Sequence, residues 1–225
     1  ELALAKRTSQ NASIILLEEP ENHLSHTRLN QLIKCISEQY AEKQILISTH
    51  SSFVANKLGL RKVMLLENLR IIKFSELSGD TYNFFKKVAG YDTLRMILCK
   101  KAILCEGDSD ELVIQKAYMQ LNDGRLPIED GIEVISVGVS FLRFLELADC
   151  IQTKIAVVTD NDGDMAAINK KYENYMGANQ KDYIKICVDD VVDTGTLKIG
   201  NNDYNYNTLE PKLLKANGLD KLNHI

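Results

Sequence analysis

The chain has 225 residues, of which 45% are hydrophobic and 26% charged, an ordinary globular composition that suffices for one large domain or two small ones. No apolar run is long enough to cross a bilayer, and the N-terminus lacks the pattern of a secretory signal, so we expect neither a membrane protein nor a secreted one. The net charge of −4 is uneven, with +3 on residues 1–98 and −7 on residues 99–225. An acidic second half excludes a module that coats nucleic acid through basic patches.

The five cysteines lie singly, mostly within apolar runs, and no Cys-x-x-Cys pair occurs. This pattern is typical of reduced, buried thiols and predicts a cytoplasmic protein without disulfides or a zinc site. The sequence opens in mid-pattern without an initiator methionine, so we expect it to be a fragment of a longer protein.

The first part of the chain predicts two buried strands joined by a helix. Apolar runs at 13–17 and 44–50 are typical of buried strands, and residues 25–43 have apolar side chains at helical spacing with Ser25 as the N-cap. Two further apolar runs predict a hairpin that turns near Asn68. We expect a helical connector over 81–98 and place the domain boundary between residues 76 and 98.

The rest of the chain alternates strands with helices. The predicted strands are 102–105, 133–136, 154–159 and 183–188, and the predicted helices are 110–121, 140–150, 165–175 and 211–217. This alternation predicts an α/β domain with a mainly parallel, helix-covered sheet, whose functional groups gather at the carboxyl ends of strands. The Tyr- and Asn-rich stretch 200–207 could stack on nucleic-acid bases, but we expect a mobile surface loop.

Paired acids follow the first strand, and a histidine follows the second. "IILLEEPENHL" places Glu18 and Glu19 at a strand end, and "ILISTHS" places His50 about thirty residues later. One carboxylate can support Mg²⁺ and the other can polarise an attacking water, while the histidine can reach a γ-phosphate. A charged turn and a solvated strand end would explain each feature alone, but their spacing behind two apolar strands favours an ATPase.

Two acidic clusters follow strands of the second half. "KKAILCEGDSDELVI" places Glu106 and Asp110 around a glycine turn, and "IAVVTDNDGD" places Asp160, Asp162 and Asp164 in the same way. If the two strands are neighbours, the clusters converge, and bare carboxylates so close would repel one another. Oxygen donors select hard cations such as Mg²⁺ or Mn²⁺, and two ions about 4 Å apart can stabilise the attacking and leaving oxygens of a phosphodiester.

Other acidic motifs can be distinguished by spacing. An EF-hand needs glycine at its sixth position and glutamate at its twelfth, whereas here Gly163 is fourth and Lys171 twelfth. A haloacid-dehalogenase-type phosphatase also opens with a strand and D-x-D, and Asp189 and Asp190 mimic its last motif. Only about thirty residues separate the two motifs, too few for its intervening motifs and lid. A solvated acidic turn is the plainest alternative.

The first pair of motifs resembles the ABC-type ATPase heads of the SMC-like class. The resemblance implies that Glu18 supports Mg²⁺, that Glu19 is the catalytic glutamate and that His50 is the switch histidine. The sequence contains no G-x-x-x-x-G-K-[ST] P-loop and no serine-rich signature before the acidic strand. We therefore expect this chain alone neither to bind nor to hydrolyse ATP, and to carry the second half of an ATPase.

The second pair of motifs, E-G-x-x-[DE] and D-x-D-G, resembles a Rossmann-like Toprim domain. A Toprim domain that directly follows part of an ABC-type head in the sequence resembles the OLD (overcoming lysogenisation defect) family of ATP-dependent endonucleases. This family includes the nuclease subunits of Gabija-type antiphage systems. The implied organisation is the C-terminal portion of an ABC-type ATPase domain at 1–75, a connector at 76–98, and a Toprim nuclease domain at 99–225 whose C-terminal part can lie beyond the sequence.

The family pattern, carried over residue by residue, implies a set of metal ligands. These are Glu106, Asp110, Asp160, Asp162, Asp164 and, in "NTLEPKLL", Glu210. Glu106 and Asp160 are also the catalytic acids that the resemblance implies. The family uses a downstream lysine near the scissile phosphate; Lys212 and Lys215 are the nearby candidates, and we expect the true one beyond Ile225.

The resemblance thus implies a Mg²⁺- or Mn²⁺-dependent DNA endonuclease, with two ions in the Toprim site, governed by an ATPase that uses ATP with Mg²⁺. Because ABC-type heads bind nucleotide between subunits, it implies at least a homodimer. It also implies a role in antiphage defence, with a helicase-like or other defence-system partner. The alternative is a non-catalytic regulatory or assembly module, whose degenerate Toprim fold binds DNA or a partner protein.

Overall fold

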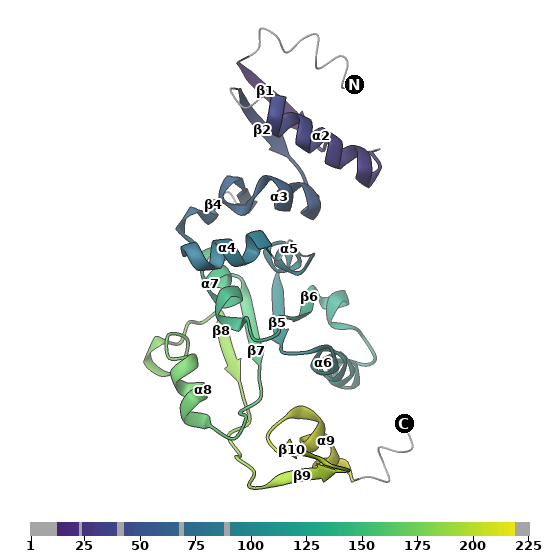
Figure 1. Ribbon diagram of the computed structural model, residues 1–225, viewed down its shortest axis with the longest axis vertical. Helices are drawn as coiled ribbons and strands as arrows, with labels where there is room; N and C mark the ends of the chain where they lie inside the picture. Colours follow the sequence, from purple (N-terminus) through teal and green to yellow (C-terminus); the bar gives the residue numbers. More distant parts are fainter. Residues whose placement is uncertain (1–12, 23, 40–42, 68–69, 88–90, 219–225) are drawn as a thin grey trace. The chain divides into compact units, whose positions relative to one another are not determined.

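The computed structural model describes residues 13–22, 24–39, 43–67, 70–87 and 91–218 of the chain (Figure 1). It divides into two compact units, Glu1–Leu94 and Arg95–Ile225, which we call the N-terminal and the C-terminal unit. The division falls inside the segment 76–98 that the sequence predicts as a connector. None of the described helices is both long and apolar enough to cross a membrane.

Two parallel strands and two helices begin the N-terminal unit. Their bounds are β1 Ile14–Glu18, α2 His26–Gln39, β2 Gln44–Ser48 and α3 Ser52–Leu58. β1 and β2 pair over their whole length, so the residues that follow the two strands lie at the same edge of the sheet. The Ser25 hydroxyl accepts the N–H of Arg28 at 3.4 Å, which confirms the predicted N-cap of α2.

One face of this small sheet is packed and the other is exposed. Leu29 and Ile33 of α2 are buried with Val54 of α3, and the partly buried Ile47 of β2 packs against this cluster. On the opposite face, 72% of Leu16 is exposed. Because strand side chains alternate between faces, the described residues of this unit leave an apolar sheet face uncovered.

Short elements complete the N-terminal unit, and the last of them, α5, continues across the boundary into the C-terminal unit. They are η1 Leu60–Lys62, β3 Met64–Glu67, β4 Arg70–Lys73, η2 Phe74–Glu76, α4 Gly79–Lys87 and α5 Tyr91–Leu98. β3 and β4 form the predicted antiparallel hairpin, and its turn near Asn68 lies outside the described residues. The predicted connector consists of two helices, α4 and α5.

A four-stranded parallel sheet forms the centre of the C-terminal unit. Its strands are β5 Lys101–Cys105, β6 Ile132–Ser136, β7 Lys154–Val158 and β8 Ile184–Cys187. Their order across the sheet is β6-β5-β7-β8, and every neighbouring pair is parallel. The predicted α/β class with a mainly parallel sheet is therefore confirmed.

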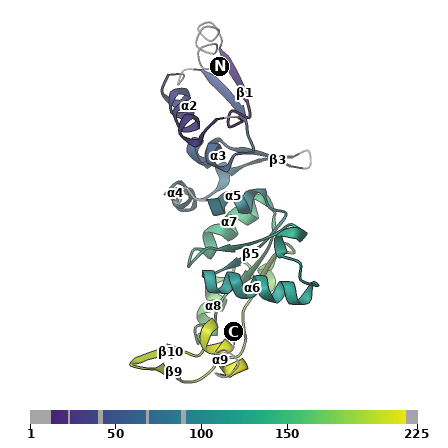
Figure 2. The same cartoon turned by 90° about the vertical axis from the view of Figure 1, so that its right-hand side faces the viewer.

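Helices cover both faces of this sheet. They are α6 Asp108–Leu121, α7 Phe141–Ile151 and α8 Met165–Lys171, and the short turns η3 Pro127–Asp130 and η4 Gly177–Asn179 lie between elements. α6 lies on one face, and α7 and α8 lie on the other (Figures 1 and 2). Right-handed crossover connections give this arrangement for this strand order.

The core lies between the sheet and its helices. Its fully buried aliphatic residues include Leu104, Ile135, Leu145, Leu147 and Val157. Each such burial stabilises the fold by roughly 1.5–3 kcal/mol, so the sheet is a rigid platform for the residues at its strand ends.

Arg95, near the end of α5, is bonded to the edge strand β6. Its Nε and Nη2 donate to Oε2 of Glu133 at 2.9 and 2.6 Å, and Nη2 also donates to the carbonyl of Val134 at 3.0 Å. Both side chains of the ion pair are about one-fifth exposed, at 22% and 20%. The pair therefore fixes the end of α5 to the sheet edge.

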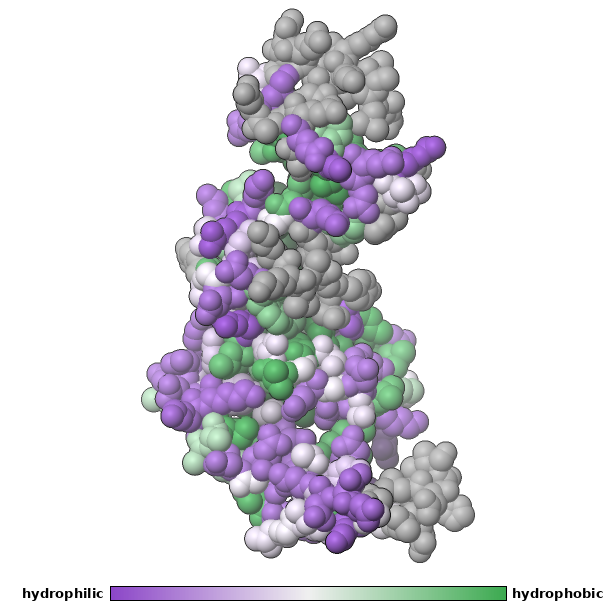
Figure 3. Space-filling view, viewed as in Figure 1, coloured by the Kyte–Doolittle hydropathy of each residue, from purple (hydrophilic) through white to green (hydrophobic). Residues whose placement is uncertain are grey.

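The segment after β8 contains a hairpin and a helix. β9 Thr196–Ile199 and β10 Asn202–Asn205 pair in antiparallel fashion, and α9 Leu209–Asn217 follows. The expectation of a mobile loop over 200–207 is therefore wrong, because most of this stretch belongs to paired or hydrogen-bonded structure. The face of this segment that Figure 3 shows is largely hydrophilic.

Candidate active site

The two acidic motifs of the C-terminal unit lie at the same edge of the sheet. Glu106 directly follows β5, and Asp160 follows β7 by two residues. β5 and β7 are neighbours, with Leu104 opposite Val157 in the register. The structure thus brings together the strand ends that the sequence analysis expected to converge.

The first motif turns directly into α6. Asp110, in the first turn of that helix, accepts the N–H of Gly107 at 2.8 Å. An acid at this position satisfies one of the free N–H groups at a helix start and interacts favourably with the helix dipole. Asp110 is therefore held beside Glu106 by the helix start.

The second motif forms a tight loop with unusual backbone angles. Asp162 has a φ of 50° and Gly163 a φ of 87°, both in the left-handed region. Asn161, only 1% exposed, donates through Nδ2 to the carbonyls of Asp189 and Val191 at 2.7 and 2.9 Å. These bonds fix the loop, between Asp160 and Asp162, to the chain that follows β8.

One acid of each motif, Glu106 and Asp160, has a raised pKa, in part because of charges on the other motif. Burial, followed by the charge of Asp110, raises the pKa of Asp160 to about 6, although the N–H of Leu209 opposes the shift; Asp162 and Glu106 raise it further. Burial and then the charge of Asp162 raise the pKa of Glu106, while Lys171 opposes and Asp110 adds to the shift. Carboxylates of each motif thus lie close enough to raise the pKa of an acid in the other, as expected for one shared cluster.

This donor set suits a hard divalent cation. Uncompensated carboxylate oxygens in a part-buried cluster are the ligands that Mg²⁺ and Mn²⁺ prefer. Among the described residues, however, no three His, Cys, Asp or Glu side chains are already arranged as a metal site. The chemistry fits the ion, and the bond from Gly107 to Asp110 is one contact that would compete with it.

The remaining predicted residues have other contacts. Asp164 caps α8 by accepting the N–H of Ala167 at 2.9 Å, and Glu210 is exposed in the first turn of α9. Lys212 is paired with Asp189 and Lys215 with Asp193. Both lysines therefore fix α9 to the chain that follows β8.

Cys105 lies beside the first motif as a neutral thiol. Burial, reinforced by Asp110, Glu111 and Asp108, raises the pKa of Cys105 to about 12. A thiol with such a pKa is not a nucleophile at neutral pH, so the chemistry of this edge of the sheet belongs to the carboxylates.

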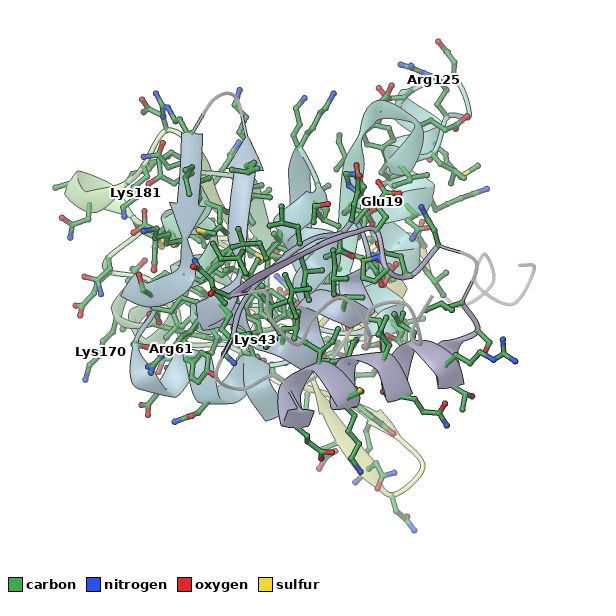
Figure 4. All side chains as sticks on the ribbon, turned by 90° about the horizontal axis from the view of Figure 1, so that it is seen from above. Glu19, Lys43, Arg61, Arg125, Lys170 and Lys181 are labelled. Carbon is green, nitrogen blue, oxygen red and sulfur yellow. The ribbon has the colours of Figure 1, made fainter. Side chains whose placement is uncertain are left out.

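In the N-terminal unit, the predicted ATPase residues lie at the ends of β1 and β2. Glu18 is the last residue of β1, and Glu19 follows it with a φ of 41° (Figure 4). Glu19 Oε1 lies 3.6 Å from Nε2 of His50, and its Oε2 accepts Nδ2 of Asn22 at 2.5 Å. The structure thus brings Glu19 and His50 together, as a water-polarising acid and a phosphate-facing histidine would require.

Sequence reasoning missed Glu21, which holds the backbone beside His50. Glu21 Oε1 accepts the hydroxyl of Thr49 at 2.6 Å and the N–H groups of His50 and Ser51, each at 3.1 Å. Burial raises the pKa of Glu21, but these bonds outweigh it and leave the pKa below its usual value. Its contacts are 28 to 30 residues away in sequence, so no local pattern reveals them.

Two family models match the sequence, and no curated protein does. The model described as "Overcoming lysogenization defect protein-like, TOPRIM domain" matches residues 97–162, which include β5, β7 and both acidic motifs through Asp162. The other is an AAA-domain model, whose description names the AbiEii toxin of a type IV TA system; it matches residues 2–56, which include Glu18, Glu19 and His50. The two matches follow one another as an ATPase domain segment and an OLD-like TOPRIM domain, which is the order of domains that the resemblance to the OLD family predicts.

Proposed function

We propose that the chain is part of a DNA endonuclease that depends on Mg²⁺ or Mn²⁺ and is governed by an ABC-type ATPase. The observation that carries this proposal is the cluster of four acids from two neighbouring strand ends, Glu106, Asp110, Asp160 and Asp162, whose mutual proximity helps to raise the pKa values of Glu106 and Asp160. The TOPRIM match covers all four residues and supports the same reaction class.

In this proposal the four acids hold the cations, with Asp164 and Glu210 as additional ligands. Two bound ions would supply stabilisation of the attacking and leaving oxygens during phosphodiester hydrolysis. Without cations, the cluster repels DNA, because residues 99–225 carry a charge of −7. The acids therefore make both substrate binding and catalysis depend on metal.

The ATPase half supplies Glu18 as support for Mg²⁺, Glu19 as the water-polarising acid and His50 as the γ-phosphate contact. The 3.6 Å approach of Glu19 to His50 supports these roles. Nucleotide bound between two heads would make the complete protein at least a homodimer.

The biological setting that we propose follows the family. OLD-type and Gabija-type relatives suggest antiphage defence in the cytoplasm, with a helicase-like or other defence-system partner. The five cysteines lie singly in the sequence, without a Cys-x-x-Cys pair, in keeping with a reducing compartment.

The test is cleavage of plasmid DNA by the complete protein with Mg²⁺ or Mn²⁺. Asp160→Ala should abolish nicking and cleavage, whereas Asp182→Ala, an exposed acid before β8, should leave both unchanged. If Asp160→Ala cuts as well as wild type, the proposed site is wrong.

A non-catalytic regulatory or assembly module is the second candidate. It is favoured by the absence, among the described residues, of three acids, cysteines or histidines already arranged for a metal, and by the pairing of Lys212 and Lys215 with aspartates. Titration with Mn²⁺ separates the two candidates: a nuclease site should bind two ions per chain, and a degenerate site one or none.

A further inference from the structure

The acidic loop after β7 is held by a segment that follows it by more than forty residues. Asn205, at the end of β10, donates through Nδ2 to the carbonyl of Asp162 at 2.8 Å. Leu209, at the start of α9, donates its N–H to Oδ2 of Asp160 at 3.2 Å. Both acids of the D-x-D motif are therefore contacted from the stretch between β10 and α9.

The orientation of the Asn205 amide is dictated by Asn207. The Oδ1 of Asn205 accepts two donors of Asn207, the backbone N–H at 2.9 Å and Nδ2 at 2.8 Å. With its oxygen engaged, the amide must turn its nitrogen toward the Asp162 carbonyl. An aspartate at position 205 would lose this donor and bring a further negative charge to the acidic loop.

Asn207 is in turn fixed to the chain that follows β8. It is 3% exposed, its Oδ1 accepts the N–H of Asp193 at 2.7 Å, and its Nδ2 donates to the Asp193 carbonyl at 2.9 Å. A buried amide whose oxygen and nitrogen are both bonded is a rigid support. The support thus extends from Asp193 through Asn207 and Asn205 to Asp162.

The loop needs such support because of its backbone. A non-glycine residue in the left-handed region, as at Asp162, is strained and persists only where its surroundings enforce that conformation. Gly163 is also left-handed, and a Cβ there would lie 3.2 Å from Nδ2 of Asn207. The asparagines therefore pack directly against the strained part of the loop.

We propose that Asn205 and Asn207 are positioning residues of the active site, which hold the loop in the conformation that presents Asp160 and Asp162 to a metal ion. This inference rests on the proposed function and adds the segment 193–209 to the site. Substitution of residues that hydrogen-bond to metal ligands and orient them typically lowers metal affinity about 10- to 100-fold.

The test compares Asn205→Ala and Asn205→Asp with Asn202→Ala, an exposed asparagine of the same strand, in the full chain. Mn²⁺ affinity is measured by calorimetric titration and by the electron paramagnetic resonance of the free ion. Hydrogen exchange of the amides of residues 160–164 is followed in EDTA, and thermal unfolding verifies that each variant is folded. Asn207→Ser, which keeps a small polar side chain, serves as a milder variant should the others unfold.

We expect Asn205→Ala to weaken Mn²⁺ binding about 10-fold or more and to speed loop exchange, Asn205→Asp to show the same faster exchange, and Asn202→Ala to match wild type. If wild type binds Mn²⁺ and folded Asn205→Ala and Asn207→Ser bind it equally well, the positioning role is wrong while the nuclease proposal stands. A wild type that binds no Mn²⁺ would overturn the nuclease proposal and, with it, the role of the asparagines at a metal.

Discussion

The two units both place acids behind parallel strands, but they hold these acids in different ways. In the N-terminal unit, the side chains of Glu19 and His50 are 39% and 89% exposed, and they follow a two-stranded sheet with an apolar face that the described part of this unit leaves uncovered. In the C-terminal unit, Asp160 follows a four-stranded sheet with helices on both faces, and a distant segment bonds its loop. The same strand-end arrangement thus yields an assembled acidic cluster in one unit and an open acid–histidine pair in the other.

The largest expected effect is a loss of ATP turnover when Glu19 is replaced, without a loss of metal binding by the acids of the C-terminal unit. In the complete protein, Glu19→Gln should keep ATP binding but lower ATP turnover by about 10²–10⁴-fold, because the amide cannot accept a proton from water. The proposed metal site uses other residues, the acids of the C-terminal unit, so these acids should keep their Mn²⁺ affinity in this variant. ATP turnover, ATP binding and Mn²⁺ binding are measured side by side with His50→Ala and, as a control, Glu38→Gln on the exposed side of α2. Equal turnover in all variants would contradict the catalytic role of Glu19.

Core substitutions should show how differently the two sheets are packed. Leu104→Ala removes a fully buried side chain of β5 and should lower the free energy of unfolding of the C-terminal unit by about 2–5 kcal/mol. Leu16→Ala alters a residue that is 72% exposed and should change stability by no more than about 0.5 kcal/mol. Denaturant unfolding of the chain measures both. A large loss for Leu16→Ala would show that a partner or another segment covers the β1–β2 face.

Glu21→Ala should destabilise the N-terminal unit by about 1–2 kcal/mol, because three donors beside β2 lose their shared acceptor. The effect should depend on pH in a defined direction. Since the folded-state pKa of Glu21 lies below 4.5, its contribution is present above that pH and is lost as the pH falls through the folded-state value. Stability measured between pH 7 and pH 3 should therefore converge for wild type and Glu21→Ala; curves that stay parallel would argue against this role.

Replacement of Asp160 should stabilise the metal-free chain, whereas replacement of Glu21 destabilises it, and the change in stability should be smaller. Its pKa rises from 3.8 to about 6 on folding, so ionisation opposes folding, and stability falls as the pH rises between those two values. After allowance for solvent screening, Asp160→Asn should stabilise the metal-free protein by about 1 kcal/mol at pH 7. Addition of Mn²⁺ should reverse the order by stabilising wild type more than the variant. Thermal unfolding in EDTA and in Mn²⁺ measures this reversal, and a variant less stable than wild type in EDTA would contradict it.

The strands and the acidic strand ends could be predicted because they leave a local pattern. β5 and β7 are short apolar runs that end in turn residues, and parallel pairing then brings Glu106 and Asp160 to one edge whatever the details of the loops. The N-cap at Ser25 is equally local, because the cap and its donor are three residues apart. These features depend on sequence neighbours and on the geometry of a parallel sheet.

The supports of both sites could not be predicted, because they depend on contacts distant in sequence. β9 is only four residues long, and β10 is polar and largely exposed, so it lacks the apolar alternation that marks a strand. Asn205 acts on Asp162 through a bond that spans 43 residues, and Glu21 acts on Thr49 through one that spans 28. Side-chain bonds to backbone groups leave no periodic pattern, so a Tyr- and Asn-rich stretch read as a loop is in fact a structural support.

The bond between Arg95 and β6 also bears on how the sheet behaves toward other molecules. An open sheet has two edge strands whose free backbone groups can recruit a strand from another chain, which leads to aggregation. At one edge, Arg95 occupies the carbonyl of Val134 and brings an ion pair with Glu133; at the other, the exposed Lys185 lies within β8. Charge at both edges disfavours such recruitment, so the C-terminal unit is protected from edge-to-edge association with other chains.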